Sequence, residues 1–262
     1  MLPKGLKPKL GFDQNFMIDE DILDRIVSMS NLTKKDTVLE IGAGTGSLTK
    51  RLAKKAGKVI AIEIDESLKS HLKKNLAGVK NVKLVFGNAL TELKHHRFNK
   101  VVSNIPYAIS EPLIQKLIGK DFDLAVLTVP KVFASRLIAD EKERRFTKLS
   151  FTFQTFFMIT DSLDIQREVF HPQPKVNSIV IKFEKKNEDS LTCGLLLRDK
   201  MKVKNAIRES LCKEKKMTKN EARKALNTLK ISSIEDKNVS ELSVSQLRKL
   251  IEKVAGFRKI NK

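Results

Sequence analysis

The chain has 262 residues and carries 51 Lys and Arg against 31 Asp and Glu, which gives a formal net charge of +20. Its hydrophobic fraction of 41% is enough to bury a core, so wholesale disorder is excluded. No apolar run reaches the roughly 18–20 residues of a membrane span, and no signal-like stretch is present near residue 1, so we expect no membrane association and a cytoplasmic location. Cys193 and Cys212 belong to no CxxC motif or Cys/His cluster, which excludes a disulfide framework and predicts no metal site.

The first two thirds of the chain alternate between short apolar runs and helical patterns. We predict buried strands at 37–41, 58–64, 82–86, 100–103 and 123–128. Apolar spacing predicts helices between them at 48–55, 66–76 and 110–118. Two later runs, at 156–165 and 177–183, flank a proline-rich turn and predict an antiparallel hairpin that completes the sheet. This order is typical of a doubly wound α/β sheet with right-handed crossovers.

The composition changes after residue 185, where helix-forming and basic residues dominate. The last 78 residues carry a net charge of +11, compared with +9 for residues 1–184. We therefore predict a larger α/β domain at 1–185 and a small basic helical domain at 186–262. A basic helical segment of this kind indicates contact with nucleic acid or another anionic surface, although a lysine-rich solvated surface is the plain alternative.

A glycine-rich loop, Glu40-Ile-Gly-Ala-Gly-Thr-Gly46, follows the first predicted strand of the sheet and opens a helix. Glycines allow positive φ and let a ligand lie against the backbone near a helix N-terminus. Glu63 ends the next strand, where an acidic side chain is suited to accept both hydroxyls of a ribose. Dehydrogenases, flavoproteins and methyltransferases all use such a loop, so the pattern predicts a nucleoside-containing cofactor without identifying it.

The segment Asn104-Ile-Pro-Tyr107 ends the fourth predicted strand of the sheet, at the edge where open α/β sheets bind ligands. An exocyclic adenine amine is a poor nucleophile because its lone pair is delocalised into the ring. The amide oxygen of Asn104 and the carbonyl of Ile105 or Pro106 are placed to accept its two N–H groups and to aim the lone pair at an electrophile. Tyr107, the only tyrosine, is placed to stack on the base, and Pro106 fixes the turn. Transfer of a sulfonium methyl group would then need no dedicated general base.

Six segments in order resemble the KsgA-type ribosomal RNA adenine dimethyltransferases, which are S-adenosylmethionine-dependent class I enzymes with a Rossmann-like fold. They are Gln14-Asn-Phe-Met17, the loop at 40–46, Glu63, Gly87-Asn-Ala-Leu90, Asn104–Tyr107 and Phe170-His-Pro-Gln-Pro-Lys-Val-Asn-Ser178. The resemblance implies catalytic roles for Asn104, Pro106 and Tyr107. It implies cofactor contacts for Gln14, Asn15, Met17, Gly42, Gly44, Gly46, Glu63, Ile64, Asn88, Ala89 and Asn104.

Several positions depart from the family pattern. Asn88 replaces an aspartate, and we expect its amide oxygen to accept from the cofactor adenine with less affinity. Met17 replaces a leucine of similar volume. Ile105, where the family usually has leucine, is common in the related Erm enzymes, which modify large-subunit rRNA. Pro130 and Val132 also depart from the family, which puts the RNA contact of their segment in doubt.

The C-terminal part favours the small-subunit branch, because residues 198–211 resemble the basic helix of the KsgA group. Its candidates for phosphate contacts are Lys200, Lys202, Lys204 and Arg208.

The expected activity is transfer of methyl groups from S-adenosyl-L-methionine to N6 of adenine in the rRNA of an immature small ribosomal subunit, giving N6,N6-dimethyladenosine. We expect no metal and, by default, a monomer. The alternatives are an Erm-like large-subunit rRNA methyltransferase and a non-catalytic RNA-binding or transcription factor on the same fold.

Overall fold

The computed structural model describes residues 14–186 and 190–260. The chain divides into two compact units, of which the first comprises residues 1–138 and 157–185 and the second residues 139–156 and 186–262. Residues 1–13, where the sequence shows no signal-like stretch, lie outside the described residues, as do residues 187–189 of the expected boundary. Within the described ranges, no helix has both the length and the apolar composition that crossing a membrane requires.

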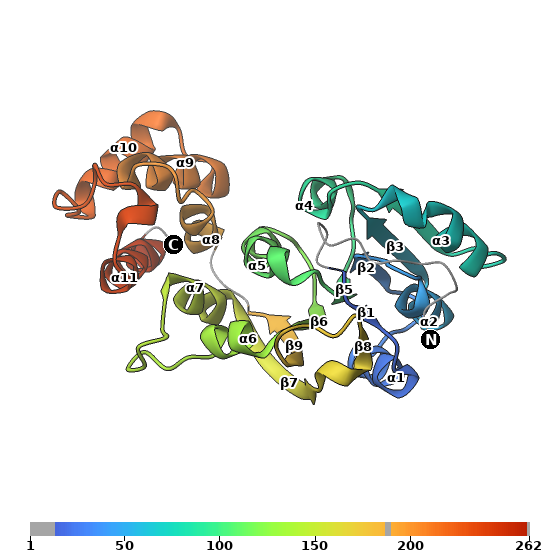
Figure 1. The fold of residues 1–262 in the computed structure, drawn as a ribbon. Helices are drawn as coiled ribbons and strands as arrows, with labels where there is room; N and C mark the ends of the chain where they lie inside the picture. The colour runs from blue at the N-terminus through green and yellow to red at the C-terminus, as the bar shows by residue number, and fades with distance from the viewer. Residues whose placement is uncertain (1–13, 187–189, 261–262) are drawn as a thin grey trace. The chain divides into compact units, whose positions relative to one another are not determined.

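A seven-stranded sheet with the order β4-β3-β2-β5-β6-β9-β7 forms the centre of the first unit (Figure 1). Its strands are β2 (Thr37–Ile41), β3 (Lys58–Glu63), β4 (Val82–Phe86), β5 (Lys100–Asn104), β6 (Leu124–Pro130), β7 (Phe157–Ile165) and β9 (Ser178–Lys185). The pairs among β2 to β6 are parallel, whereas β9 is antiparallel to both β6 and β7. The predicted parallel sheet and its terminal antiparallel pair are confirmed.

Both faces of this sheet are covered. Each residue from Val38 to Ile41 is at most 1% exposed, which is expected of a strand buried on both sides. On one face, Leu23, Leu52 and Leu72 pack in a single cluster with Val38 and Val102. The helices of this unit are α1 (Glu20–Met29), α2 (Ser47–Lys55), η2 (Glu66–Leu68), α3 (Lys69–Asn75), α4 (Ala89–Glu92), η3 (Leu93–His95), η4 (Tyr107–Ile109), α5 (Ser110–Ile118), α6 (Lys131–Leu137) and η5 (Arg167–Val169).

The strand order creates a switch point beside β2. From β2 the chain moves outward to β3 and β4, and it then returns to the other side of β2 to form β5 and β6. The loops that follow β2 and β5 therefore diverge at the carboxyl edge of the sheet, which is where open α/β sheets bind ligands.

A second, two-stranded sheet joins distant parts of the chain in the first unit. Strand β1 (Phe16–Met17) pairs antiparallel with β8 (Phe170–His171), and the Ile18 N–H donates to the Val169 carbonyl over 2.8 Å. The pairing brings the segment that begins at Gln14 beside the segment that ends at Ser178. Sequence patterns alone do not predict this contact, because each strand has only two residues.

The second unit is helical. It contains α7 (Lys148–Phe156), α8 (Ser190–Leu196), α9 (Val203–Lys215), α10 (Lys219–Thr228), η6 (Val239–Glu241) and α11 (Val244–Ile260). Phe151 of α7 lies in one apolar cluster with Leu195, Ile207 and Leu250, and the Arg248 guanidinium lies 5.7 Å from the centre of its ring. The structure therefore differs from the expected boundary at 185 in one segment: residues 139–156 belong to the helical unit, because Phe151 of α7 packs into its core.

A buried polar network holds the amino ends of β2 and β5. The carboxylate of Asp36 accepts hydrogen bonds from the Thr33 N–H over 2.6 Å and from the Asn99 amide over 2.7 Å, and it lies 3.2 Å from Lys100 Nζ. Burial alone would raise the pKa of Asp36, but the bonds from Asn99, Thr33 and Lys100 lower it from 3.8 to about 2. The ionised carboxylate is therefore the form that stabilises the fold.

We expect Asp36→Asn to lower the free energy of unfolding at pH 7 by about 2 kcal/mol. Because the pKa is depressed on folding, this contribution is complete above the unfolded value and is lost as the pH falls from about 4 toward 2. Denaturant unfolding over that pH range measures it, as the difference between wild type and variant. Asp123→Asn is the matched control, because Asp123 is exposed and contacts the same Asn99 amide over 3.1 Å. An equal loss of unfolding free energy in the two variants would contradict the stabilising role assigned to the Asp36 carboxylate.

Candidate functional site

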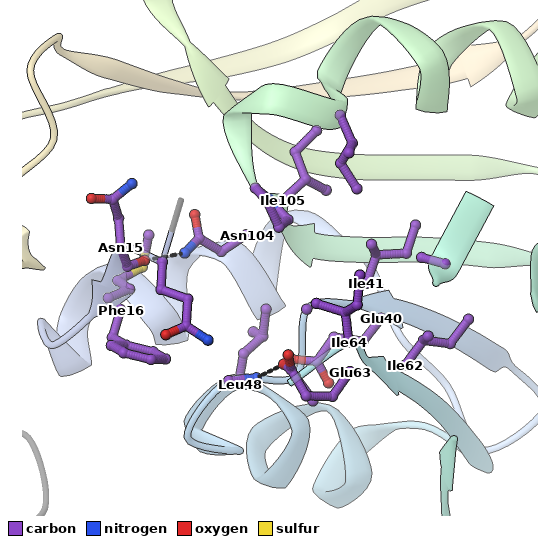
Figure 2. Close-up of a pocket in the computed structure, with 18 of the residues that line it drawn as sticks. Asn15, Phe16, Glu40, Ile41, Leu48, Ile62, Glu63, Ile64, Asn104 and Ile105 are labelled. Atoms are coloured by element: carbon purple, nitrogen blue, oxygen red, sulfur yellow. Dashed lines mark hydrogen bonds between the residues drawn. The ribbon is translucent and has the colours of Figure 1, made fainter. Parts of the chain in front are cut away.

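A cavity of about 260 Å³ opens at the carboxyl edge of the sheet, between the loops that follow β2, β3 and β5 (Figure 2). It brings together most of the predicted site residues. Those that line it are Gln14, Asn15, Met17, Gly42, Gly44, Glu63, Ile64, Asn88, Ala89, Asn104, Pro106 and Tyr107. Segments that are far apart in the sequence thus share one cavity, as their strand-end positions predict.

The glycine loop supplies one wall of the cavity. Gly44 has a φ of +56°, and a Cβ atom there would lie 3.1 Å from the ring of Phe16, so both its conformation and its surroundings require glycine. Gly46, which we expected among the cofactor contacts, is not a lining residue. It precedes α2 with a φ of +82°, and a Cβ atom there would lie 3.1 Å from Leu72. Gly46 is therefore the N-cap residue of α2, at a position with little room for a side chain.

The carboxylate of Glu63 anchors this loop to the end of β3. Its Oε2 accepts from the Gly44 N–H over 2.7 Å, and its Oε1 accepts from the Asp65 N–H over 2.9 Å. Burial raises the pKa of Glu63, and these two amide bonds oppose that effect. Each carboxylate oxygen keeps a second lone pair, so the group can accept further hydrogen bonds from a ligand in the cavity.

A second carboxyl group, that of Glu40, also lines the cavity (Figure 2). It is 1% exposed, and its Oε2 has no hydrogen-bond partner among the described residues. Burial, reinforced by the charge of Glu63, raises the pKa of Glu40 from 4.5 to about 8. Glu40 is the first residue of the glycine-rich segment in the sequence, but we did not predict it as a site residue.

Asn104 is the last residue of β5 and points toward the N-terminal segment (Figure 2). Its Nδ2 donates to the Asn15 carbonyl over 3.0 Å, which fixes the orientation of the amide. Its Oδ1 is buried and accepts no hydrogen bond from the part of the chain that the structure describes. A buried acceptor without a partner is costly, by roughly 1–3 kcal/mol, so a ligand that donates to this atom relieves that penalty.

Pro106 and Tyr107 continue the chain from this strand end. Pro106 has a φ of −57° and a ψ of 128°, and its carbonyl accepts from the Ile109 N–H over 3.1 Å, which forms the short helix η4. Tyr107 begins η4, is partly buried, and makes a hydrogen bond through its hydroxyl with Ser178 Oγ. Tyr107 therefore lines the same cavity as Asn104, and its hydroxyl is bonded to β9.

Asn88 is the residue whose surroundings differ most from expectation. It is exposed, and its Oδ1 accepts from the Leu90 N–H over 2.9 Å, which caps the N-terminus of α4. The expected contact with a cofactor adenine would have to share this oxygen with the cap. The helix cap therefore leaves the amide Nδ2 as the freer hydrogen-bonding atom of this side chain.

The four basic candidates of the C-terminal segment fall into two classes. Lys202 Nζ and Lys204 Nζ both lie near Asp236 Oδ1, at 3.4 Å and 2.7 Å. Lys200 is exposed and Arg208 is partly buried on α9, and neither forms an ion pair with another described residue. Across residues 14–186 and 190–260, no three His, Cys, Asp or Glu side chains gather as a metal site would require, and neither Cys193 nor Cys212 forms a disulfide.

Comparison with known proteins places this geometry in context. Residues 5–255 match the family described as ribosomal RNA adenine dimethylase. A protein from Thermococcus sibiricus, named probable ribosomal RNA small subunit methyltransferase A, is 42% identical over 71% of this chain and 67% of its own length. The protein of the same name from Methanococcus aeolicus is 34% identical over 97% of both chains. The crystal structure of a dimethyladenosine transferase from Plasmodium falciparum, 27% identical, superimposes with a TM-score of 0.65 over 93% of this chain and 98% of that one.

Proposed function

Because this chain belongs to the ribosomal RNA adenine dimethylase family, we propose that it transfers two methyl groups to N6 of an adenine in small-subunit ribosomal RNA. The observation that carries the proposal is the buried Oδ1 of Asn104, an acceptor without a partner among the described residues, whose orientation is set by the Asn15 carbonyl. An exocyclic amine carries two N–H groups, so it can donate the hydrogen bond that this oxygen lacks.

We propose S-adenosyl-L-methionine as the cofactor of this cavity, where it would supply an electrophilic sulfonium methyl group. The residues present fit it. Glu63 has acceptor capacity for two ribose hydroxyls, and the backbone of Gly42 and Gly44 allows close approach because neither position carries a Cβ atom. Asn88 and Ala89 lie at the cavity where the family resemblance places the cofactor adenine.

The substrate amine needs two acceptors to be held with its lone pair free. Asn104 Oδ1 is the first. For the second, the sequence leaves the carbonyls of Ile105 and Pro106 both open, and the structure favours Ile105, since the Pro106 carbonyl already accepts from the Ile109 N–H. Two such bonds orient the nitrogen toward the methyl donor. Orientation of this kind can lower a reaction barrier by several kcal/mol. Tyr107 would stack on the base, which must leave its own stack to arrive there.

Product analysis tests this reaction class. Methyl-labelled S-adenosylmethionine is incubated with unmethylated small ribosomal subunits, and the RNA is digested to nucleosides. We expect label in N6,N6-dimethyladenosine. Label in a different nucleoside would contradict the role of Asn104, and a bound cofactor without any transfer would support a non-catalytic RNA-binding protein instead.

We propose that the basic helical unit contacts the rRNA backbone. Lys200 and Arg208 carry charges that no described acidic residue pairs with, whereas Lys202 and Lys204 share Asp236. We expect the variant Lys200→Ala/Arg208→Ala to bind rRNA more weakly, with a salt slope (log K against log[salt]) that is shallower by about 0.7–0.9 for each phosphate that is no longer bound. Lys202→Ala/Lys204→Ala removes the same charge and is the matched control.

A filter-binding or fluorescence titration at several salt concentrations gives both slopes. Full-length variants are preferable to a truncation at residue 184, because α7 precedes that point and packs in the helical core. A larger slope change in the control pair than in Lys200→Ala/Arg208→Ala would contradict the assignment of these contacts.

A further inference from the structure

Ser178 connects the strand framework of the sheet with the ring of Tyr107. It is the first residue of β9, it is fully buried, and its Oγ is hydrogen bonded to the Tyr107 hydroxyl. Its backbone lies between two neighbouring strands, opposite Pro130 of β6 and Ile165 of β7. Pairing on both sides fixes the backbone of Ser178, and its complete burial restricts the rotation of its hydroxyl.

Tyr107 is also held at its other end. Its backbone follows β5 closely and begins η4, whose turn is closed by the bond from the Ile109 N–H to the Pro106 carbonyl. Tyr107, held at these two points, lines the cavity that Asn104 also lines. A hydrogen bond at the hydroxyl fixes the direction of the Tyr107 ring axis, and because a phenol O–H prefers to lie in the plane of its ring, a fixed partner also favours one orientation of that plane. A ligand that binds against this ring therefore has less side-chain freedom to order.

We propose that Ser178 is a positioning residue, which directs the axis of the Tyr107 ring and favours one orientation of its plane, so that a flat substrate base stacks beside Asn104. This inference rests on the proposed methyl transfer to adenine, and it adds a residue outside the cavity to that reaction. Ser178 touches neither cofactor nor base. Its effect therefore falls on the RNA substrate and on turnover, whereas cofactor affinity stays unchanged.

The composition of the chain provides a direct probe of this contact. Tyr107 is the only tyrosine and the chain has no tryptophan, so near-ultraviolet absorption and emission from tyrosine report on this one phenol. We expect Ser178→Ala to shift the tyrosine spectrum of the full-length protein, because the phenol exchanges its partner for water. Tyr107→Phe removes the signal and confirms its origin. Ser162→Ala, at an exposed position of β7 in the same sheet, is the control and leaves the spectrum unchanged.

Kinetics with the same variants test the consequence. We expect Ser178→Ala to lower kcat/KM for the RNA on the order of tenfold, with the dissociation constant of S-adenosylmethionine within about twofold of wild type. Because the two hydroxyls act through one bond, the loss in the double variant Tyr107→Phe/Ser178→Ala should be close to that of Tyr107→Phe alone.

The outcomes separate this inference from the proposed function. An unchanged tyrosine spectrum in Ser178→Ala, additive losses in the double variant, or an equal loss of cofactor affinity would overturn the positioning role. Absence of methyl transfer in the wild-type protein would instead count against the proposed function. Even then, the spectrum would still decide whether Ser178 holds the Tyr107 phenol.

Discussion

Replacing Asn104 by alanine is expected to reduce methyl transfer to rRNA by a factor on the order of 10²–10³ while the protein remains folded. The side chain lies at a strand end and lines the cavity, where its Nδ2 donates to the Asn15 carbonyl. Alanine therefore removes the acceptor for the substrate amine and leaves the apolar core untouched. Single-turnover transfer of a labelled methyl group at saturating cofactor measures the loss.

Two controls make this result specific. Circular dichroism melting of Asn104→Ala should show a loss of about 1 kcal/mol at most, as expected for one partly buried hydrogen bond. Asn220→Ala, at an exposed position of α10, should transfer methyl groups at the wild-type rate. Near-wild-type turnover in Asn104→Ala would contradict the amine-positioning role of its Oδ1.

Replacing Glu63 by alanine is expected to weaken S-adenosylmethionine binding by about 1.5–3 kcal/mol, which corresponds to a dissociation constant higher on the order of 10- to 150-fold. The carboxylate would accept hydrogen bonds from the ribose hydroxyls. It also accepts hydrogen bonds from the Gly44 and Asp65 N–H groups, so alanine loosens the glycine loop as well. Glu63→Gln keeps one acceptor oxygen and should lose less. Calorimetric titration measures both, and Glu66→Ala, an exposed carboxylate three residues away, is the control.

The same residue predicts a pH dependence of binding. Burial raises the pKa of Glu63 above its ordinary value, and the ionised form is the one that accepts two hydroxyl bonds. Cofactor affinity should therefore fall as the pH decreases, beginning at a higher pH than for an ordinary glutamate, and Glu63→Gln should flatten this dependence. Unchanged affinity in Glu63→Ala at neutral pH would reject the ribose contact.

Local patterns predicted the framework of this protein well, for a physical reason. Strands β2 to β6 are short runs rich in Val, Ile and Leu, and the central ones are buried on both faces, so they stand out against their polar flanks. Once the strands are placed, the parallel order puts Gly44, Glu63 and Asn104 at one edge of the sheet. The place of the cavity could therefore be predicted from the strand ends, whereas Gln14, Asn15 and Met17 were assigned to it through the family resemblance.

Contacts between distant segments could not be predicted in this way. The pairing of β1 with β8 depends on two-residue strands, and the place of α7 in the helical unit depends on Phe151, whose apolar neighbours Leu195, Ile207 and Leu250 lie far along the chain. The expected boundary at 185 treated residues 139–156 as part of the α/β domain for that reason. Only tertiary packing shows where this segment belongs.

Side-chain chemistry was hardest to predict where a residue has two possible partners. Asn88 caps α4 with the oxygen that we expected to face the cofactor, and Lys202 and Lys204 pair with Asp236, which is distant in the sequence. Gly46 starts α2 and does not line the cavity. In each case the residue type is compatible with the predicted role, and the structure adds a local contact that the sequence does not show.

A competition between two RNA substrates tests which ribosomal RNA this protein methylates. Unmethylated small ribosomal subunits and naked large-subunit rRNA are offered together with labelled S-adenosylmethionine, and the label is then located by nucleoside analysis of each RNA. We expect N6,N6-dimethyladenosine in the small-subunit RNA, and Ile105 would then be a neutral replacement of the family's usual leucine. Label in the large-subunit RNA would contradict this expectation and would assign the chain to an Erm-like activity.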